Sequence, residues 1–179
     1  PLLVDTLKQM SQDGVRFAVG MIMSVFQSSS SWGQYQMEIS TALTSAGIDL
    51  KFAYTPPFFD QPGFINTMAR HIRECGKQAS HSRPTDAHIV FTAHSLPVSD
   101  PQSALYEQQV AYSAARIAHS LGCDRWRVAY QSRSGRPQDP WLEPDVNDAL
   151  RQLVREGVRE VTLAPIGFVC DNIEVLYDL

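Results

Sequence analysis

The sequence predicts an α/β protein in which parallel sheets are flanked by helices. Short apolar segments rich in Val, Ile, Phe and Tyr alternate along the chain with longer segments of helical periodicity. This alternation is typical of strand–helix–strand units, in which helices cover both faces of a parallel sheet. Glycines such as Gly47, Gly122 and Gly157 separate the segments, because Gly adopts a left-handed helix cap at little cost.

The expected elements follow one another in a regular order. Strands are predicted at residues 15–26, 48–54, 87–93, 127–131 and 158–166, each short and apolar. Helices are predicted at residues 2–12, 33–45, 63–78, 102–121 and 146–156. In the helix at 102–121, an apolar stripe is formed by Leu105, Val110, Ala114, Ile117 and Leu121. Functional sites in folds of this class lie at the carboxyl ends of the strands.

A sequence pattern that occurs twice in the chain, called the internal echo, bears on the domain organisation. Residues 7–16 and 150–159 share the pattern of a helix, a Gly and then a strand. Helix–Gly–strand joints can look alike in unrelated segments; the alternative is two similar α/β domains in tandem. On the second interpretation, residues 1–47 are the C-terminal part of a first domain and residues 48–179 are most of a second. Because the chain begins without Met and stops inside an expected helix, we expect a fragment with an incomplete first domain.

Composition narrows the class of protein. The 179 residues are 44% hydrophobic and 19% charged with a net charge of −4, which excludes a disordered chain and binding of nucleic acid by bulk charge. Cys75, Cys123 and Cys170 show neither a disulfide framework nor a metal-site spacing, so a reducing compartment is expected. The longest apolar run is about half the ~20 residues that cross a bilayer, and no signal peptide is visible. We therefore expect a cytoplasmic protein.

One candidate functional residue is His94, in the segment Phe91-Thr92-Ala93-His94-Ser95-Leu96-Pro97. An apolar strand leads directly into this His, which places it at the carboxyl end of a sheet strand. A neutral imidazole can ligate a borderline metal or accept a proton near pH 7. The alternative is a His whose ring is satisfied by loop backbone.

Three carboxylates follow the last predicted strand. Asp171, Glu174 and Asp178 are spaced i, i+3 and i+7, so they share one face of an expected helix that begins near Asp171. The helix dipole favours acids in a first turn, which accounts for Asp171 better than for Asp178. Cys170, next to these acids, is interpreted as a small buried residue rather than a ligand.

Two loops could line a pocket. The first runs through Tyr130-Gln131-Ser132-Arg133-Ser134-Gly135-Arg136-Pro137 to Trp141, and its arginines and aromatic side chains suit a flat anionic ligand. The second, at residues 27–35, is rich in Ser and uncharged. Both can also be plain surface loops. No Walker loop and no G-x-G-x-x-G motif occurs in the sequence, so the alternation of strands and helices does not indicate a nucleotide-binding site.

Taken together, three motifs resemble one family. F-T-A-H-S-L-P, then Y-Q-S-R-S-G with P-W-L-E-P, then P-I-G-F-V-C-D-N-I-E-V-L-Y-D-L occur in the order found in ferrochelatases. The chain is similar, more narrowly, to bacterial coproporphyrin III ferrochelatases, including those of actinobacteria. The resemblance implies two Rossmann-like domains around a porphyrin cleft, and insertion of ferrous iron into a porphyrin, coproporphyrin III in the narrower group, during haem synthesis.

The resemblance also implies roles for particular residues. His94 matches the family's metal-site His, and Glu174 matches its partner acid. Asp178 matches an acid thought to help deliver metal, Tyr35 a Tyr that contacts porphyrin, and Trp141 belongs to the cleft wall. A His at this site suits removal of the pyrrole protons as iron enters.

Two positions depart from the family pattern. Asn172 stands where relatives often have His, and Trp32 stands where some relatives have an iron–sulfur cluster Cys. We therefore expect no iron–sulfur cluster and no dissociable cofactor, because iron and porphyrin are both substrates. We expect a monomer that binds no nucleic acid and has no integral membrane segment. Two other functions stay open: a chelatase for another metal or tetrapyrrole, and a tetrapyrrole-binding protein without catalysis.

Overall fold

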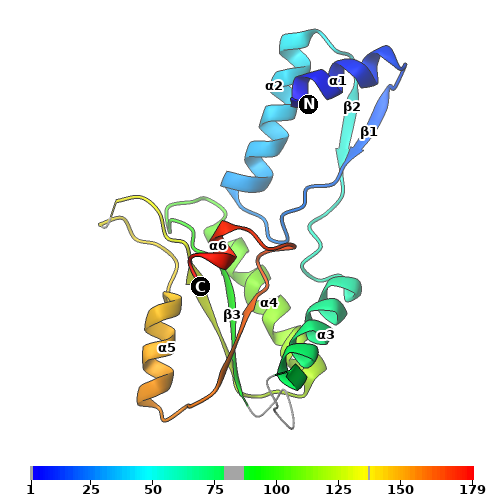
Figure 1. The fold of residues 1–179 in the computed structure, drawn as a ribbon. Helices are drawn as coiled ribbons and strands as arrows, with labels where there is room; N and C mark the ends of the chain where they lie inside the picture. Colours follow the sequence, from blue (N-terminus) through cyan, green and yellow to red (C-terminus); the bar gives the residue numbers. More distant parts are fainter. Residues whose placement is uncertain (1, 79–86, 137) are drawn as a thin grey trace.

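The computed structural model describes residues 2–78, 87–136 and 138–179, and it contains two parallel sheets (Figure 1). In the first sheet, β1 (Phe17–Gly20) pairs with β2 (Lys51–Tyr54). In the second, β3 (His88–His94) lies between β4 (Trp126–Gln131) and β5 (Val161–Pro165). All these pairs are parallel, so the predicted α/β class with parallel sheets is confirmed.

The first sheet packs beside α1 (Leu3–Gln12) and α2 (Gln34–Ala46), in the upper part of Figure 1. Leu7, Ala18 and Leu50 form its small buried core. Side chains of a strand alternate between faces, so the neighbours of Ala18, Phe17 and Val19, point the other way and are exposed.

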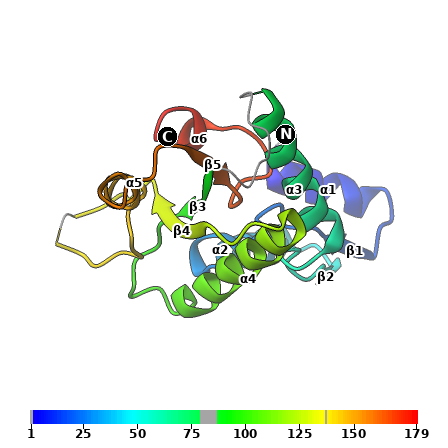
Figure 2. The ribbon, with the colours of Figure 1, turned by 90° about the horizontal axis from the view of Figure 1, so that it is seen from below.

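The second sheet is covered on both faces, as apolar parallel strands require. On one face, α3 (Pro62–Gln78) and α4 (Ser103–Leu121) pack against Ile89, Phe91 and Ala93. On the other face, α5 (Val146–Arg155) packs against Val90 and Ala129. Figure 2 shows α5 on the opposite side of the strands from α3 and α4.

The internal echo corresponds to two joints of the same geometry. Gly14 after α1 has a φ of 79°, and Gly157 after α5 has a φ of 83°. In each joint the first residue after the Gly donates its backbone N–H back into the helix, Val15 to Met10 and Val158 to Leu153, both at 3.0 Å. A left-handed Gly therefore redirects each chain from helix to strand.

The predicted domain boundary between residues 47 and 48 stays a prediction. The pairing of β2 with β1 places residues 51–54 in the first sheet, on the far side of that boundary. The strand predicted at 15–26 is shorter than expected, since β1 ends at Gly20. Val25 and Phe26 are buried in the core of the second sheet, so the chain crosses there from one sheet to the other.

Two helices differ from expectation. In α4 the residue turned inward is Tyr106, while Leu105 of the predicted stripe is exposed. After β5 the expected acidic helix is only the short α6 (Ile173–Leu176). Within the described residues, no helix combines the length and the apolar character needed to cross a membrane.

Candidate functional site

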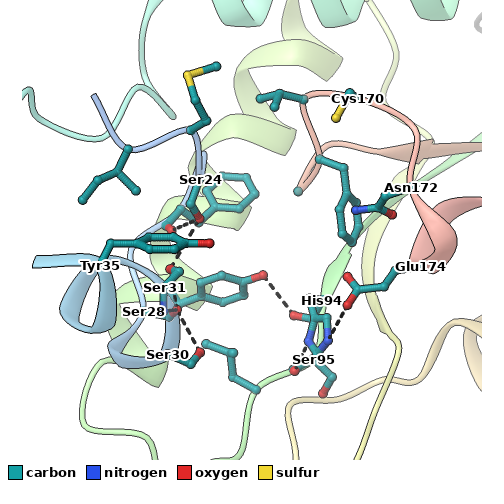
Figure 3. Close-up of a pocket in the computed structure, with 18 of the residues that line it drawn as sticks. Ser24, Ser28, Ser30, Ser31, Tyr35, His94, Ser95, Cys170, Asn172 and Glu174 are labelled. Atoms are coloured by element: carbon teal, nitrogen blue, oxygen red, sulfur yellow. Dashed lines mark hydrogen bonds and ion pairs between the residues drawn. The ribbon is translucent and has the colours of Figure 1, made fainter. Parts of the chain in front are cut away.

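A cavity of about 960 Å³ lies where the carboxyl ends of the two sheets face each other (Figure 3). Its lining comes from the loop after β1 and the start of α2 on one side. On the other side it comes from the segments that follow β3 and β5. Sites in α/β folds form at such strand ends, and the volume suits a large organic ligand.

His94 is the last residue of β3 and lines the cavity. Its Nδ1 contacts the Ser95 carbonyl oxygen, and since a carbonyl can only accept, Nδ1 carries the hydrogen. The other ring nitrogen, Nε2, lies 3.5 Å from Oε1 of Glu174. The two side chains are 30% and 36% exposed, so both are reached from the cavity.

Glu174 sits in α6 and is held there by its neighbours. The Asn172 side chain caps the helix by accepting the Val175 N–H at 3.1 Å. The buried Gln131, at the end of β4, donates its Nε2 hydrogen to the Glu174 carbonyl. The helical turn that carries the Glu174 carboxylate toward His94 is therefore held by its cap residue and by a residue of β4.

Gly167 fixes how closely the loop after β5 approaches β3. Its N–H donates to the Thr92 carbonyl at 3.2 Å. A Cβ at Gly167 would lie 3.0 Å from both Cα and Cβ of Ala93, the residue before His94. Gly167 is thus required for the close approach of this loop to β3.

Tyr106 of α4 holds the backbone of His94 in place. Its hydroxyl donates to the His94 carbonyl at 2.9 Å. Burial raises the pKa of Tyr106 far above its ordinary value, and the nearby Tyr130 and Glu174 raise it further. The phenol therefore keeps its hydrogen and remains a donor at any ordinary pH.

We call the opposite side the serine wall, made of Ser24, Ser28, Ser30, Ser31 and Tyr35. Buried Ser28 accepts the Ser31 N–H at 3.1 Å and contacts the Ser31 hydroxyl at 2.7 Å. This caps a π-helical turn (Ser29–Gly33) that leads into α2. Figure 3 shows these residues facing His94 and Glu174 across the cavity.

We call the other side the histidine wall, made of His94, Trp141, Asn172 and Glu174. Trp141 reaches the cavity because its strand-like segment bridges Pro97 in antiparallel fashion, just after β3. The next residue, Leu142, donates its N–H to Leu96 at 2.9 Å. The positions of all four residues are thus set by the end of β3 or by the loop after β5.

Comparison with known proteins identifies the family. A family model described as Ferrochelatase matches residues 1–179. The chain belongs to the ferrochelatase family. The resemblance inferred from the three motifs is confirmed.

Curated ferrochelatase relatives give the same result in finer detail. The chain is 39% identical over 183 residues to the coproporphyrin III ferrochelatase of Mycolicibacterium smegmatis, covering 100% of the chain and 54% of that protein. It is 42% identical over 183 residues to that of Mycobacterium marinum, covering 100% of the chain and 53% of that protein. The chain spans about half the length of the curated relatives it matches.

Of the predicted site residues in this ferrochelatase-family chain, the structure brings His94, Glu174, Tyr35 and Trp141 to one cavity. Asp178 lies elsewhere, and its carboxylate accepts a hydrogen bond from the Ser132 hydroxyl.

The prediction that three acids share a helix face is wrong. Because α6 runs only from Ile173 to Leu176, Asp171 and Asp178 both lie outside it. Asp171 lines a second cavity, of about 670 Å³, between α3 and β5. Cys170 is exposed, so its interpretation as a buried residue is also wrong.

Sequence reasoning missed the residues that hold the site together. Gln131 anchors Glu174, Tyr106 anchors His94, and Gln109 of α4 contacts the chain beside the serine wall. A signal was present, because polar residues at 106, 109 and 113 interrupt the inward face of an otherwise apolar helix at helical spacing. Such a pattern marks buried polar groups that need partners.

Proposed function

We propose that the protein is a lyase that inserts ferrous iron into coproporphyrin III in haem biosynthesis. The observation that carries this proposal is the His94–Glu174 pair, 3.5 Å apart on one wall of a cavity large enough for a porphyrin. Family membership and the names of the relatives support it. His94 and Glu174 are the proposed catalytic and metal-binding residues.

The proposed proton chemistry follows from the tautomer of His94. Insertion exchanges two pyrrole N–H protons for one Fe²⁺, so two protons must leave the ring. With hydrogen on Nδ1, the lone pair of Nε2 is free to take a proton from a pyrrole nitrogen. The Glu174 carboxylate stabilises the resulting imidazolium and offers a route for protons toward solvent.

The same pair would hold the incoming iron in an earlier step, because the Nε2 lone pair of His94 cannot bind Fe²⁺ and accept a proton at the same time. Fe²⁺ arrives hydrated, and an imidazole with a carboxylate can bind it while water is stripped away. Among the described residues, no group of three or more His, Cys, Asp or Glu side chains gathers around one point. Two protein donors suit an ion that must be released to four ring nitrogens, whereas a full ligand set would retain it.

The aromatic side chains of both walls would receive the macrocycle. Tyr35 and Trp141 line the cavity from opposite walls and offer flat aromatic surfaces. Asp178, just after α6, remains a proposed residue of the metal delivery path, and its carboxylate accepts a hydrogen bond from the Ser132 hydroxyl.

Trp32 supports the proposal that no iron–sulfur cluster is present. Its indole is buried and donates to the Ser24 carbonyl at 3.2 Å, and an indole offers no cluster ligand. We also propose a cytoplasmic monomer without a dissociable cofactor.

A chelatase for another metal or tetrapyrrole is the second candidate, and a non-catalytic binding protein is the third. Steady-state insertion assays on the full-length protein separate them, with Fe²⁺ or Co²⁺ and with coproporphyrin III or protoporphyrin IX. We expect the highest kcat/KM for Fe²⁺ with coproporphyrin III. Faster insertion of Co²⁺, or tight porphyrin binding with no insertion of either metal, would refute the proposal.

A further inference from the structure

Three buried polar side chains lie on the inward face of α4. Tyr106, Gln109 and Ser113 are spaced i, i+3 and i+7, so they form one row along the helix. Buried polar groups are costly unless they are hydrogen-bonded, and each of these is bonded to a different segment of the chain. The row therefore joins parts of the molecule that are far apart in sequence.

Tyr106 connects α4 to the histidine wall. Its hydroxyl donates to the His94 carbonyl at 2.9 Å. Its ring meets Phe26 edge-on, with centroids 5.7 Å apart and planes at 80°. Phe26 belongs to the segment that crosses between the sheets, so the Tyr106 ring touches that segment while its hydroxyl holds His94.

Gln109 connects the same helix to the serine wall. Its Oε1 accepts the backbone N–H of Gln27 at 2.8 Å, and its Nε2 donates to Oε1 of Gln27 at 3.4 Å. Gln27 directly precedes Ser28, which caps the turn leading into α2 and Tyr35. The position of Gln27 thus determines where the capped turn of the serine wall begins.

Ser113 completes the row by donating to the Phe59 carbonyl at 2.6 Å. Phe59 lies in the connection between β2 and α3, the second place where the chain passes from one sheet to the other. Both crossings are therefore hydrogen-bonded to one face of α4.

We propose that Gln109 is a positioning residue that sets the separation of the serine wall from the histidine wall, and hence the affinity for the porphyrin. The inference rests on the function proposed above. A rigid helix that binds both walls within one turn holds the gap before the ligand arrives. Without the Gln109 amide, the Gln27 N–H is left without its buried acceptor, and the wall samples other positions. The apparent porphyrin affinity is then reduced in proportion to the fraction of molecules in which the two walls keep the correct separation.

The test compares Gln109→Met with Gln27→Met in the full-length protein. Met matches Gln in length, so Gln109→Met removes both amide contacts with little change in packing. Gln27→Met removes only the 3.4 Å contact, because the 2.8 Å bond uses the Gln27 backbone. We expect the porphyrin KM to rise ~5–10-fold in Gln109→Met and less than ~2-fold in Gln27→Met, with the metal KM unchanged in both.

The dissociation constant for coproporphyrin III, measured by quenching of porphyrin fluorescence without metal, gives a second readout that needs no catalysis. It should rise with the porphyrin KM. Unchanged porphyrin affinity in a folded Gln109→Met protein would overturn the inference. An equal rise in the porphyrin KM and the metal KM of Gln109→Met would also overturn it. If the wild-type protein binds porphyrin but inserts no metal, the proposed function is refuted. The dissociation constants of wild type and Gln109→Met would still test the role of Gln109.

Discussion

The two walls of the cavity are built alike and differ in chemistry. Each follows the carboxyl ends of parallel strands, and each contains a capped turn, closed by Ser28 in the serine wall and by Asn172 in the histidine wall. The serine wall carries hydroxyl groups and a phenol, whereas the histidine wall carries the imidazole of His94 and the carboxylate of Glu174.

This difference indicates a division of labour. The groups proposed to exchange protons and bind metal gather on one wall, while the other offers neutral hydrogen-bonding groups and an aromatic ring. Changes at His94, Asn172 or Glu174 should therefore alter metal handling and proton transfer, whereas changes in the serine wall or at Trp141 should alter porphyrin binding. Three predictions test this contrast, and a fourth concerns the opposite end of β3.

The largest of these four effects is expected from Glu174→Gln. The amide keeps the shape of the side chain but removes the negative charge 3.5 Å from His94 Nε2. We expect a loss of about 100-fold in kcat/KM for the metal, with porphyrin affinity within about twofold. Steady-state kinetics with each substrate varied separately measures this. A parallel loss of porphyrin affinity would break the proposed division.

Gly167→Ala should have the next largest effect. Its Cβ would lie 3.0 Å from Ala93 and push the loop after β5 away from the end of β3. We expect roughly tenfold lower kcat and a destabilisation of about 1–3 kcal/mol in denaturant unfolding. Gly33→Ala is the matched control, since Gly33 is helical and a Cβ there would meet no atom within 4 Å beyond its chain neighbours and its own helix backbone. Equal effects of the two substitutions would contradict this explanation.

The two caps offer a symmetrical test. Ser28→Ala and Asn172→Ala each remove one cap, at a cost of about 1 kcal/mol to the local turn. We expect about a threefold rise in porphyrin KM for Ser28→Ala and about a threefold rise in metal KM for Asn172→Ala. If both variants changed the same KM, the walls would not be functionally distinct.

The smallest effect concerns His88, at the amino end of the strand that ends in His94. Burial lowers the pKa of His88, and the positive charge of Arg127 lowers it further, against the opposing effect of Glu156. The unfolded chain therefore binds a proton at higher pH than the folded one. Stability is lost as pH falls below about 6.5.

The variant His88→Gln should lose this part of the pH dependence. Thermal unfolding of wild type and variant at pH 7.5 and pH 5.5 measures it, and we expect the difference in Tm between the two pH values to shrink. Insertion activity at pH 7.5 should stay unchanged. An unaltered pH dependence would exclude His88 as its source.

Much of the fold was predictable because strands and helices here follow simple periodicities. The helices at 3–12, 103–121 and 146–155 begin and end within one or two residues of the predicted positions. The strand at 15–26 was overextended, because the apolar residues Val25 and Phe26 serve the core of the other sheet. Periodicity reports burial, but it does not report which sheet buries a residue.

The site was predictable only in its lining residues. His94 and Glu174 carry recognisable motifs, and the strand-end rule places His94 correctly. The supporting contacts of Gln131 and Gln109 join residues 43 and 82 positions apart, so no local pattern specifies them. The acidic helix face failed for a local reason, since α6 ends at Leu176 before the third acid is reached.

We propose that His94 takes the pyrrole protons once the metal has left the His94–Glu174 pair for the porphyrin. The most direct measurement is single-turnover insertion of Fe²⁺ into prebound coproporphyrin III by wild type and His94→Ala. We expect the insertion rate constant to fall by roughly 1,000-fold in His94→Ala, while the dissociation constant for the porphyrin changes less than about twofold. Insertion at the wild-type rate in His94→Ala would contradict the account.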